Sequence, residues 1–241
     1  MTFEASAYSA KGIREINEDS FLISSLHNEL GKGFTEYYIE GNDDKLIFFV
    51  VADGMGGQGS GEKASNFVIT KLKELSEENI YLDETILIDK IENIHSLIIQ
   101  HDSKMGSTLS GIILQKNISG LVNLGDSRTY RLRNGMFLKL TNDDSLKKYE
   151  SNAASNIITN GIGGGLKSIS VNCRFSDKTI IPGDIFLMCS DGVHGYISDD
   201  EIENILSMKT NSKEMSATIV QKAITNGSDD NCTAIVVIFK E

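Results

Sequence analysis

Four aspartates mark the ends of short apolar runs, and this pattern constrains the fold more than any other feature of the sequence. The runs are FFVVADG with Asp53, LVNLGDSR with Asp126, IFLMCSDG with Asp191 and SDDNCTAIVVIF with Asp230. Apolar runs of this length are typical of strands buried in a sheet. An ionised carboxylate at such a position is costly unless a cation or hydrogen-bond donors compensate its charge.

A single Asp-Gly pair such as Asp53-Gly54 has a simple interpretation as a strand followed by a turn. Four such strand ends in one chain favour a shared carboxylate cluster instead. Carboxylates brought close together cannot all stay ionised without compensation, and divalent cations supply it. The sequence therefore predicts a cation site where these strands end.

The expected ligands are all oxygens, namely Asp carboxylates, the backbone carbonyl of Gly54 and water. Such ligands suit Mg²⁺ or Mn²⁺. No His or Cys stands at a comparable position, as zinc would require, and no EF-hand loop is present. Two ions that share one bridging carboxylate would orient and acidify a water molecule for attack on phosphorus.

Arg14, in SAKGIREINEDSFLI, is the candidate for binding a substrate phosphate, because a guanidinium matches phosphate geometry. A surface salt bridge to Glu15 or Glu18 is an equally good interpretation of its spacing. Both remain open.

The secondary-structure signals predict an α+β fold. Apolar residues recur at helical spacing over 62–79 and 83–101, whereas short strands follow Met105. Asn134-Gly135 indicates a hairpin, and Ser198 with Glu201 is typical of a helix capping box. Strands that are joined by hairpins imply antiparallel sheets, with the helices in separate blocks.

We expect one domain over 1–241, because the chain has a single proline and no linker-like segment. Two segments are ambiguous. Residues 26–46 are expected to form a polar hairpin or long loop, and residues 142–168 an irregular surface segment.

Composition excludes some partners. The net charge of −11 argues against binding to a nucleic acid or an anionic membrane. Three cysteines without metal-ligand spacing suggest a reduced, intracellular setting, and neither a leader peptide nor a membrane span is evident. The chain is therefore expected to be cytoplasmic.

Taken together, these motifs make the sequence resemble the type 2C (PPM) family of metal-dependent protein serine/threonine phosphatases, in its bacterial form. The resemblance runs through nearly the whole chain, in the family's order: GIREINEDS, VVADGMGG, MGSTLSGIIL, LGDSRTYRLRNG, LTNDDS, GDIFLMCSDGV and DDNCTAIVV. It implies a four-layer αββα sandwich of two antiparallel sheets flanked by helix pairs. It also implies hydrolysis of phosphoserine and phosphothreonine in proteins by a binuclear Mg²⁺ or Mn²⁺ centre.

The resemblance assigns roles to individual residues. Asp53 would bridge two metals, one of them also bound by the Gly54 carbonyl and completed by Asp191 and Asp230. Glu18, with Asp19 behind it, would hold the second metal, and Arg14 would clamp the phosphate. The remaining assignments are a third, weaker metal at Asp126 and Asp191, and supporting hydrogen bonds from Asn231, which would orient Asp230, and from Ser190 and Thr108.

Three features depart from the family pattern. Met55 stands where some members have a histidine that is thought to act as general acid, and a thioether cannot donate a proton. Asp143-Asp144-Ser145 replaces the usual Asp-His-Ser. The flap subdomain is reduced to about 142–160, and the insert at 26–46 is long enough to form part of the cleft wall.

Other functions are weighed against this one. A catalytically silent phosphatase-fold regulatory module should have lost at least one of Asp53, Asp191 and Asp230, and all are present. A phosphatase of small phosphate esters would need the same residues and stays open. The chain lacks the phosphate-binding loop of a Cys-based phosphatase and that of a nucleotide-binding kinase, which disfavours both functions. The resemblance implies phosphoprotein substrates, an opposing serine/threonine kinase and a monomer.

Overall fold

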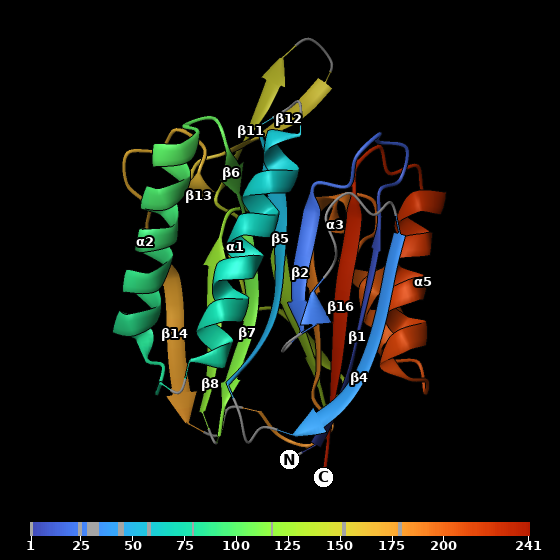
Figure 1. Ribbon diagram of the computed structural model, residues 1–241. Helices are drawn as coiled ribbons and strands as arrows, with labels where there is room; N and C mark the ends of the chain where they lie inside the picture. The colour runs from blue at the N-terminus through green and yellow to red at the C-terminus, as the bar shows by residue number, and fades with distance from the viewer. Residues whose placement is uncertain are drawn as a thin grey trace.

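The computed structural model describes residues 2–23, 26–27, 34–42, 46–56, 59–78, 80–116, 118–150, 153–177 and 180–241. These residues form two stacked antiparallel sheets with helices on both outer faces (Figure 1). The predicted α+β class and the four-layer αββα arrangement are confirmed.

The first sheet has six strands and brings the two ends of the chain together. β1 and β16 pair from Thr2↔Lys240 to Ala10↔Cys232, so the termini lie at the same end of the sandwich (Figure 1). In spatial order the strands are β10 (Met136–Lys139), β9 (Arg128–Arg133), β15 (Ile185–Cys189), β16 (Cys232–Lys240), β1 (Thr2–Ala10) and β4 (Phe34–Asn42).

The second sheet has eight strands, with β5 near its centre. Its main path is β13 (Ile162–Gly163), β6 (Gly106–Ser107), β5 (Ile47–Met55), β7 (Leu109–Gln115), β8 (Ile118–Leu124) and β14 (Asn172–Asp177). Off this path, β2 (Asp19–Ile23) pairs with β5 and with β3 (Leu26–His27).

Helices cover the outer face of each sheet, where apolar stripes at helical spacing predict them. α1 (Ser60–Glu77) and α2 (Glu84–His101) pack on the eight-stranded sheet through residues such as Leu72 and Ile91. α4 (Asp199–Leu206) and α5 (Ser212–Thr225) pack on the six-stranded sheet. The capping box at Ser198 and Glu201 is confirmed. The short helix α3 (Asp191–His194) has no counterpart in the sequence-based expectations.

The space between the sheets is filled by alternate residues of both. Phe3 and Phe49 meet edge to face, with ring centroids 5.1 Å apart, and Phe186 and Phe239 do the same at 5.8 Å. Each fully buried aromatic side chain contributes roughly 1.5–3 kcal/mol. This apolar layer fixes the position of one sheet relative to the other, and with it the positions of the loops at the ends of their strands.

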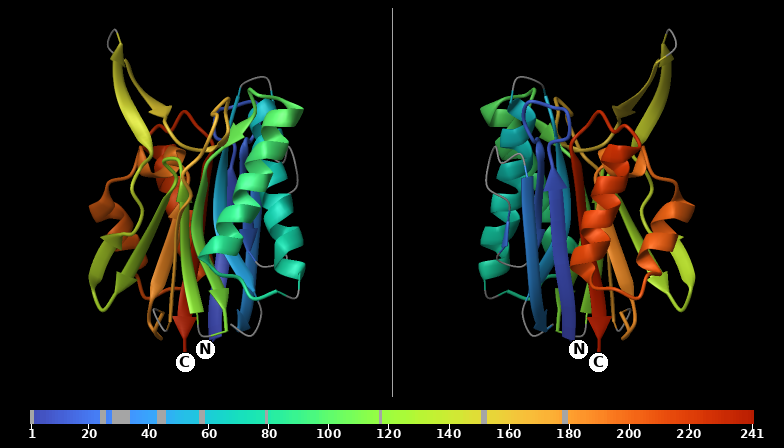
Figure 2. Two further views of the ribbon diagram at one scale, coloured as in Figure 1. Left: turned by 90° about the vertical axis from the view of Figure 1, so that its left-hand side faces the viewer. Right: turned by 90° about the vertical axis from the view of Figure 1, so that its right-hand side faces the viewer.

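The sequence suggested that the segment 142–168 is irregular, but the structure contains two paired strands there. β11 (Ser145–Glu150) and β12 (Ala153–Ile158) pair from Ser145↔Ile158 to Glu150↔Ala153 and form a two-stranded ribbon that projects beyond the sandwich (Figure 2). Asn and Ser recur in its sequence, but strand pairing satisfies the backbone whatever the side chains are.

The segment 26–46 also contains strands. β3 pairs with β2 and β4 pairs with β1, in different sheets, so these two strands do not form a hairpin with each other. Residues 28–33 and 43–45 lie outside the described residues, so the role of this segment as a cleft wall stays a prediction. No helix in the described ranges has the length and apolarity to cross a membrane.

Candidate metal centre

The predicted site residues come from loops and strand ends at one end of the sandwich, opposite the chain termini (Figure 1). Asp53 lies near the end of β5, Asp126 between β8 and β9, Asp191 at the start of α3 and Asp230 just before β16. Strands from both sheets end here. The stacking of the sheets therefore brings together residues that are far apart in sequence.

Asp53 sits directly opposite another carboxylate. The antiparallel pairing of β2 with β5 aligns Asp19 with Asp53. Opposite residues of an antiparallel pair have neighbouring side chains, and like charges there are destabilising. On the other side of β5, the Asp53 backbone N–H donates to Thr108 Oγ1 at 2.9 Å, and the Thr108 N–H donates to the Asp53 carbonyl at 2.9 Å.

The glycines after Asp53 allow the start of α1 to lie against the end of β5. A Cβ on Gly54 would come within 2.1 Å of the Gly61 carbonyl oxygen, and one on Gly61 within 2.6 Å of the Gly54 oxygen. Only glycine fits at either position. The close contact also places the Glu18 carboxylate beside the N–H groups of Gly61 and Glu62 at the start of the helix.

A second close contact brings Asp191 next to Asp230. A Cβ on Gly192 would lie 2.0 Å from the Asn231 carbonyl oxygen. The first turn of α3 is thereby pressed against the segment that precedes β16. Asp191 at the start of α3 and Asp230 just before β16 consequently face the same space.

Arg14 points toward this cluster and pairs with Asp230. Its Nη2 donates to Asp230 Oδ2 at 2.8 Å, and its Nε donates to the Asp229 carbonyl at 2.7 Å. This ion pair is neither of the salt bridges, to Glu15 or Glu18, that the sequence spacing left open. Arg14 therefore lies at the edge of the carboxylate cluster rather than apart from it.

Asn231 contacts the Asp230 carboxylate through its backbone, whose N–H donates to Asp230 Oδ1 at 2.8 Å. The side-chain amide donates to the carbonyls of Lys11 and Ile16 and accepts from the Glu18 N–H. Asn231 thus fastens the loop that carries Arg14 and Glu18.

Ser190 and Thr108 support the carboxylates from behind. Ser190 Oγ donates to Asp19 Oδ2 at 2.7 Å and accepts from the Thr233 N–H at 3.1 Å. Thr108 Oγ1 bonds to Ser127 Oγ at 2.7 Å and accepts from the Asp53 backbone. Both residues are buried. Ser190 lies behind the cleft, whereas Thr108 also lines it.

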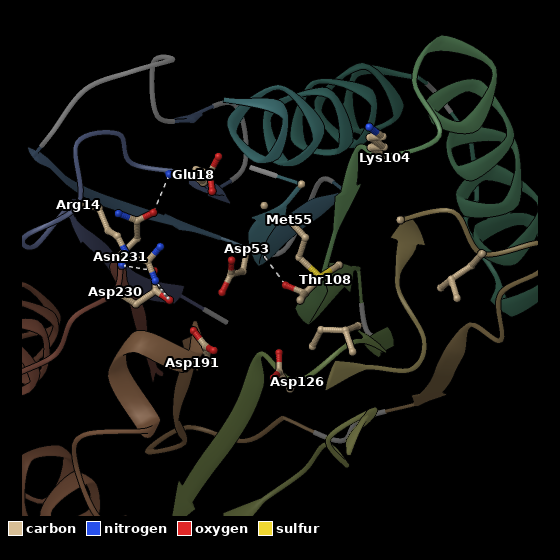
Figure 3. A pocket seen from close by; sticks show the side chains of 15 residues that line it. Arg14, Glu18, Asp53, Met55, Lys104, Thr108, Asp126, Asp191, Asp230 and Asn231 are labelled. Carbon is tan, nitrogen blue, oxygen red and sulfur yellow. Dashed lines mark hydrogen bonds and ion pairs between the residues drawn. The ribbon is translucent and has the colours of Figure 1, made fainter. Parts of the chain in front are cut away.

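A cleft of about 440 Å³ unites these residues. Figure 3 shows the side chains of Asp53, Asp126, Asp191 and Asp230 around a common space, with Arg14 and Asn231 on one side. Its lining includes the predicted residues Arg14, Glu18, Asp53, Gly54, Thr108, Asp126, Asp191, Asp230 and Asn231. Asp19 and Ser190 are buried behind it.

The cleft strongly disfavours the charged form of its carboxyl groups. Burial, followed by the charges of Asp19, Asp191 and Asp230, raises the pKa of Asp53 well above its usual range. Burial raises the pKa of Asp19 and of Asp126 to about 7, and the charge of Asp191 adds to both shifts. Such shifts indicate a site in which a bound cation or a shared proton compensates the carboxylate charges.

The donor set fits hard divalent cations. Asp126 Oδ2 and Asp191 Oδ1 are buried and accept no hydrogen bond from any residue that the structure describes. Within the same residues, no three acidic, His or Cys side chains already converge as a closed metal site. Oxygen ligands that line a wet cleft suit Mg²⁺ or Mn²⁺ with several waters retained.

Sequence reasoning missed two residues. Lys104 lines the cleft beyond Met55, across from Arg14 in Figure 3, and gives no signal in the sequence because it stands alone after a helix. His194 is packed beside the cleft, and its Nε2 lies 3.0 Å from the Asp126 carbonyl oxygen. Burial lowers the pKa of His194 to about 4, so the neutral ring donates to that carbonyl and fixes the Asp126 loop.

The aspartates of the LTNDDS motif serve the scaffold. Asp143 pairs with Arg128, Nη2 to Oδ2 at 2.6 Å. Asp144 Oδ2 accepts from Asn160 Nδ2 at 2.7 Å, and its backbone N–H donates to the Gly125 carbonyl. These contacts anchor the base of the β11–β12 ribbon beside Asp126.

A carboxylate-lined cleft between two stacked antiparallel sheets defines a class of enzymes that use divalent metals in phosphoryl chemistry. Comparisons with known proteins narrow this class. The chain is 30% identical over 238 residues to the serine/threonine phosphatase stp of Listeria welshimeri, covering 88% of this chain and 90% of that protein. It is 31% identical over 239 residues to a putative protein phosphatase 2C-type of Streptococcus pyogenes, covering 88% and 96%. No family model matches the sequence.

Solved structures agree. The serine/threonine phosphatase PstP/Ppp of Mycobacterium tuberculosis superposes with a TM-score of 0.77 at 26% identity and full coverage of both chains. The catalytic domain of PstP in complex with two manganese ions gives 0.75 at 26% identity, again with full coverage. The chain belongs to the 2C-type (PPM) family of bacterial serine/threonine protein phosphatases.

Proposed function

We propose that this protein hydrolyses phosphoserine and phosphothreonine in proteins with a binuclear Mn²⁺ or Mg²⁺ centre. The observation that carries the proposal is the convergence of Glu18, Asp53, Asp126, Asp191 and Asp230 on one cleft with Arg14 at its edge. A silent regulatory module would not need this complete set of carboxylates. The manganese-bound PstP structure supports the choice of metal.

In this proposal the residues divide the work. Asp53 would be shared by the two ions, the Gly54 carbonyl, Asp191 and Asp230 would serve as ligands of one, and Glu18 with Asp19 behind it would hold the other. Asp126 and Asp191 would hold a third, weaker ion. The bound ions would stabilise charge on the phosphoryl oxygens and lower the pKa of an attacking water molecule.

Arg14 binds the substrate phosphate. Its guanidinium is about half exposed at the cleft edge, and cation binding to Asp230 would release it from the ion pair seen here. The guanidinium fork then matches two phosphate oxygens. Met55 lines the cleft and cannot donate a proton, so the leaving alkoxide must take its proton from water or from another group.

The proposed setting is cytoplasmic, with a monomeric enzyme acting against a serine/threonine kinase on phosphoproteins. The acidic net charge supports neither a nucleic-acid nor a membrane partner. Sedimentation of the purified protein tests the monomer.

The decisive experiment is phosphate release from a phosphothreonine peptide with Mn²⁺, with Mg²⁺ and with a chelator. We expect turnover with either metal and none with the chelator, and loss of turnover in Asp191→Asn. The exposed Asp89 on α2 gives a matched control, Asp89→Asn, that should keep full activity. Metal binding without turnover would favour the silent module. Faster hydrolysis of a generic aryl phosphate than of the peptide, as kcat/KM, would favour the small-ester alternative.

A further inference from the structure

A second pocket lies on the flank of the sandwich, and it shares none of its lining residues with the metal cleft. It has a volume of about 120 Å³ and lies between β9 and β15 of one sheet and β7, β8 and β14 of the other. Two arginines line it, Arg131 from β9 and Arg174 from β14. Two basic side chains in one small pocket are unexpected in a chain with a net charge of −11.

Strand register explains how the arginines come together. In the six-stranded sheet Arg131 is aligned with Phe186, and in the eight-stranded sheet Arg174 is aligned with Leu121, which is in turn aligned with Ile112. These cross-strand rows line the same pocket from opposite sheets. Phe186 and Ile112 are buried, so the pocket has an apolar inner end and basic sides.

Among the described residues, the Arg131 guanidinium has no hydrogen-bond acceptor. Its Nε is buried without a hydrogen-bond partner among the residues that the structure describes. Asp184 is the carboxylate that acts on Arg131, yet it is taken up by Arg133, Nη2 to Oδ2 at 2.5 Å, and by the Ile181 N–H at 3.0 Å. A buried cation without an acceptor costs free energy, and such a group normally has a partner.

The charges around Arg131 and Arg174 also favour an anionic ligand. Burial, and then the positive charge of Arg133, lowers the pKa of Arg131. No ion pair or side-chain hydrogen bond within the described ranges involves Arg174, which is exposed at the pocket mouth. Asp184 is paired with Arg133, and within the described ranges neither Arg131 nor Arg174 has an ion-pair partner.

We propose that the flank pocket binds a phosphate group between Arg131 and Arg174. A tetrahedral dianion balances two guanidinium groups and offers enough oxygens to accept from both forks. A single carboxylate would occupy one fork and leave the other unsatisfied. This site is separate from the proposed catalytic centre and does not depend on it.

Two sources of the phosphate are compatible with the shape. The pocket itself has room for a small free anion. A neighbouring cavity of about 300 Å³ shares Leu121, Leu140 and Arg174 with it and adds neutral polar groups from Asn123 and Asn172. The organic part of a phosphomonoester would occupy this second cavity.

The test is a titration of the metal-free protein with inorganic phosphate and, separately, with O-phosphoserine. Metal-free protein is used because the carboxylate cleft then repels anions and turns over no ester. The first readout is the ¹⁵N–¹H resonance of the Arg131 side-chain Nε–H. We expect it to shift and saturate, since the unsatisfied N–H gains an acceptor.

Variants locate the binding. Arg174→Gln is expected to weaken phosphate binding by at least about tenfold, as for loss of a charge-assisted hydrogen bond. Arg131→Lys should weaken it less than Arg131→Gln, because lysine keeps the positive charge and loses only the forked geometry of the guanidinium. Arg14→Gln, at the metal cleft, should leave the affinity unchanged. Tighter binding of inorganic phosphate identifies a free-anion site, and tighter binding of O-phosphoserine identifies an ester site.

Two outcomes would overturn the proposal. One is an Arg131 resonance that does not move at saturating phosphate, which needs no variant to fold. The other is phosphate binding that is lost in Arg14→Gln and kept in Arg174→Gln, which would place the anion in the metal cleft.

Discussion

The Arg14 guanidinium donates to Asp230 Oδ2 at 2.8 Å, so the proposed phosphate clamp and a proposed metal ligand hold each other. The pair is half exposed, and pairs of this kind contribute only about 0–1 kcal/mol to stability. Its interest is functional. In the proposed mechanism, a cation bound by Asp230 would compete with Arg14 for the same oxygen and would free the guanidinium for substrate.

Arg14→Ala is expected to raise KM more than it lowers kcat, because the guanidinium contacts phosphate in both the ground state and the transition state. Steady-state kinetics on a phosphothreonine peptide measures this. The thermal midpoint of the variant should stay close to that of the wild type, since the lost pair is exposed. An unchanged KM would reassign Arg14 to a structural ion pair with Asp230.

Asp53→Asn should abolish turnover and make the metal-free protein more thermostable. The substitution removes the bridging charge and also relieves its repulsion with Asp19, directly opposite on β2. Phosphatase assays and thermal melts in a chelator measure the two effects, with Asp89→Asn as the control for loss of an exposed charge. Activity at the wild-type level would reject the bridging role.

The stability of the metal-free protein should fall as pH rises from about 4 to about 7. Asp19 and Asp126 have a pKa of about 7 in the folded state against an ordinary value of 3.8, so the folded state holds more protons within this window. Stability then decreases with pH until these groups are ionised. Thermal melts in a chelator at several pH values test the sign.

His194 acts in the opposite direction, because its pKa is lowered to about 4 and its stability contribution grows with pH. Asp53→Asn retains His194 and serves as the reference: the wild type should lose stability with pH more steeply than this variant. The carboxylates of the cleft should contribute equally to stability at pH 5 and at pH 7.5 when Mn²⁺ is saturating. A wild-type curve parallel to that of the variant would contradict the predicted shift of Asp53.

Met55→His should accelerate hydrolysis of a phosphothreonine peptide more than that of an aryl phosphate. An alkoxide leaving group needs a proton, whereas a phenolate leaves without one, so a general acid helps only the first. Met55 already lines the cleft between Asp53 and Lys104. Met55→Leu is the control for lost thioether packing, and an equal effect of His and Leu on both substrates would exclude an acid at this position.

The sequence by itself predicted many of the helices and strands and indicated the chemistry of the site. Apolar periodicity located α1 and α2, Asn134-Gly135 located the β9–β10 hairpin, and the aspartates at strand ends indicated a cation cleft. These signals are local, since each depends on residues a few positions apart. Family motifs then ordered the aspartates into one site.

Only the tertiary structure decided how the site is held. The choice of Asp230 as the partner of Arg14, the fastening of the 11–18 loop by Asn231 and the pairing of Asp19 with Asp53 all depend on strand register and on the stacking of two sheets. The same is true of Arg131 and Arg174, which lie on different sheets. Contacts between residues far apart in the chain are set by packing as a whole, and no short stretch of sequence encodes them.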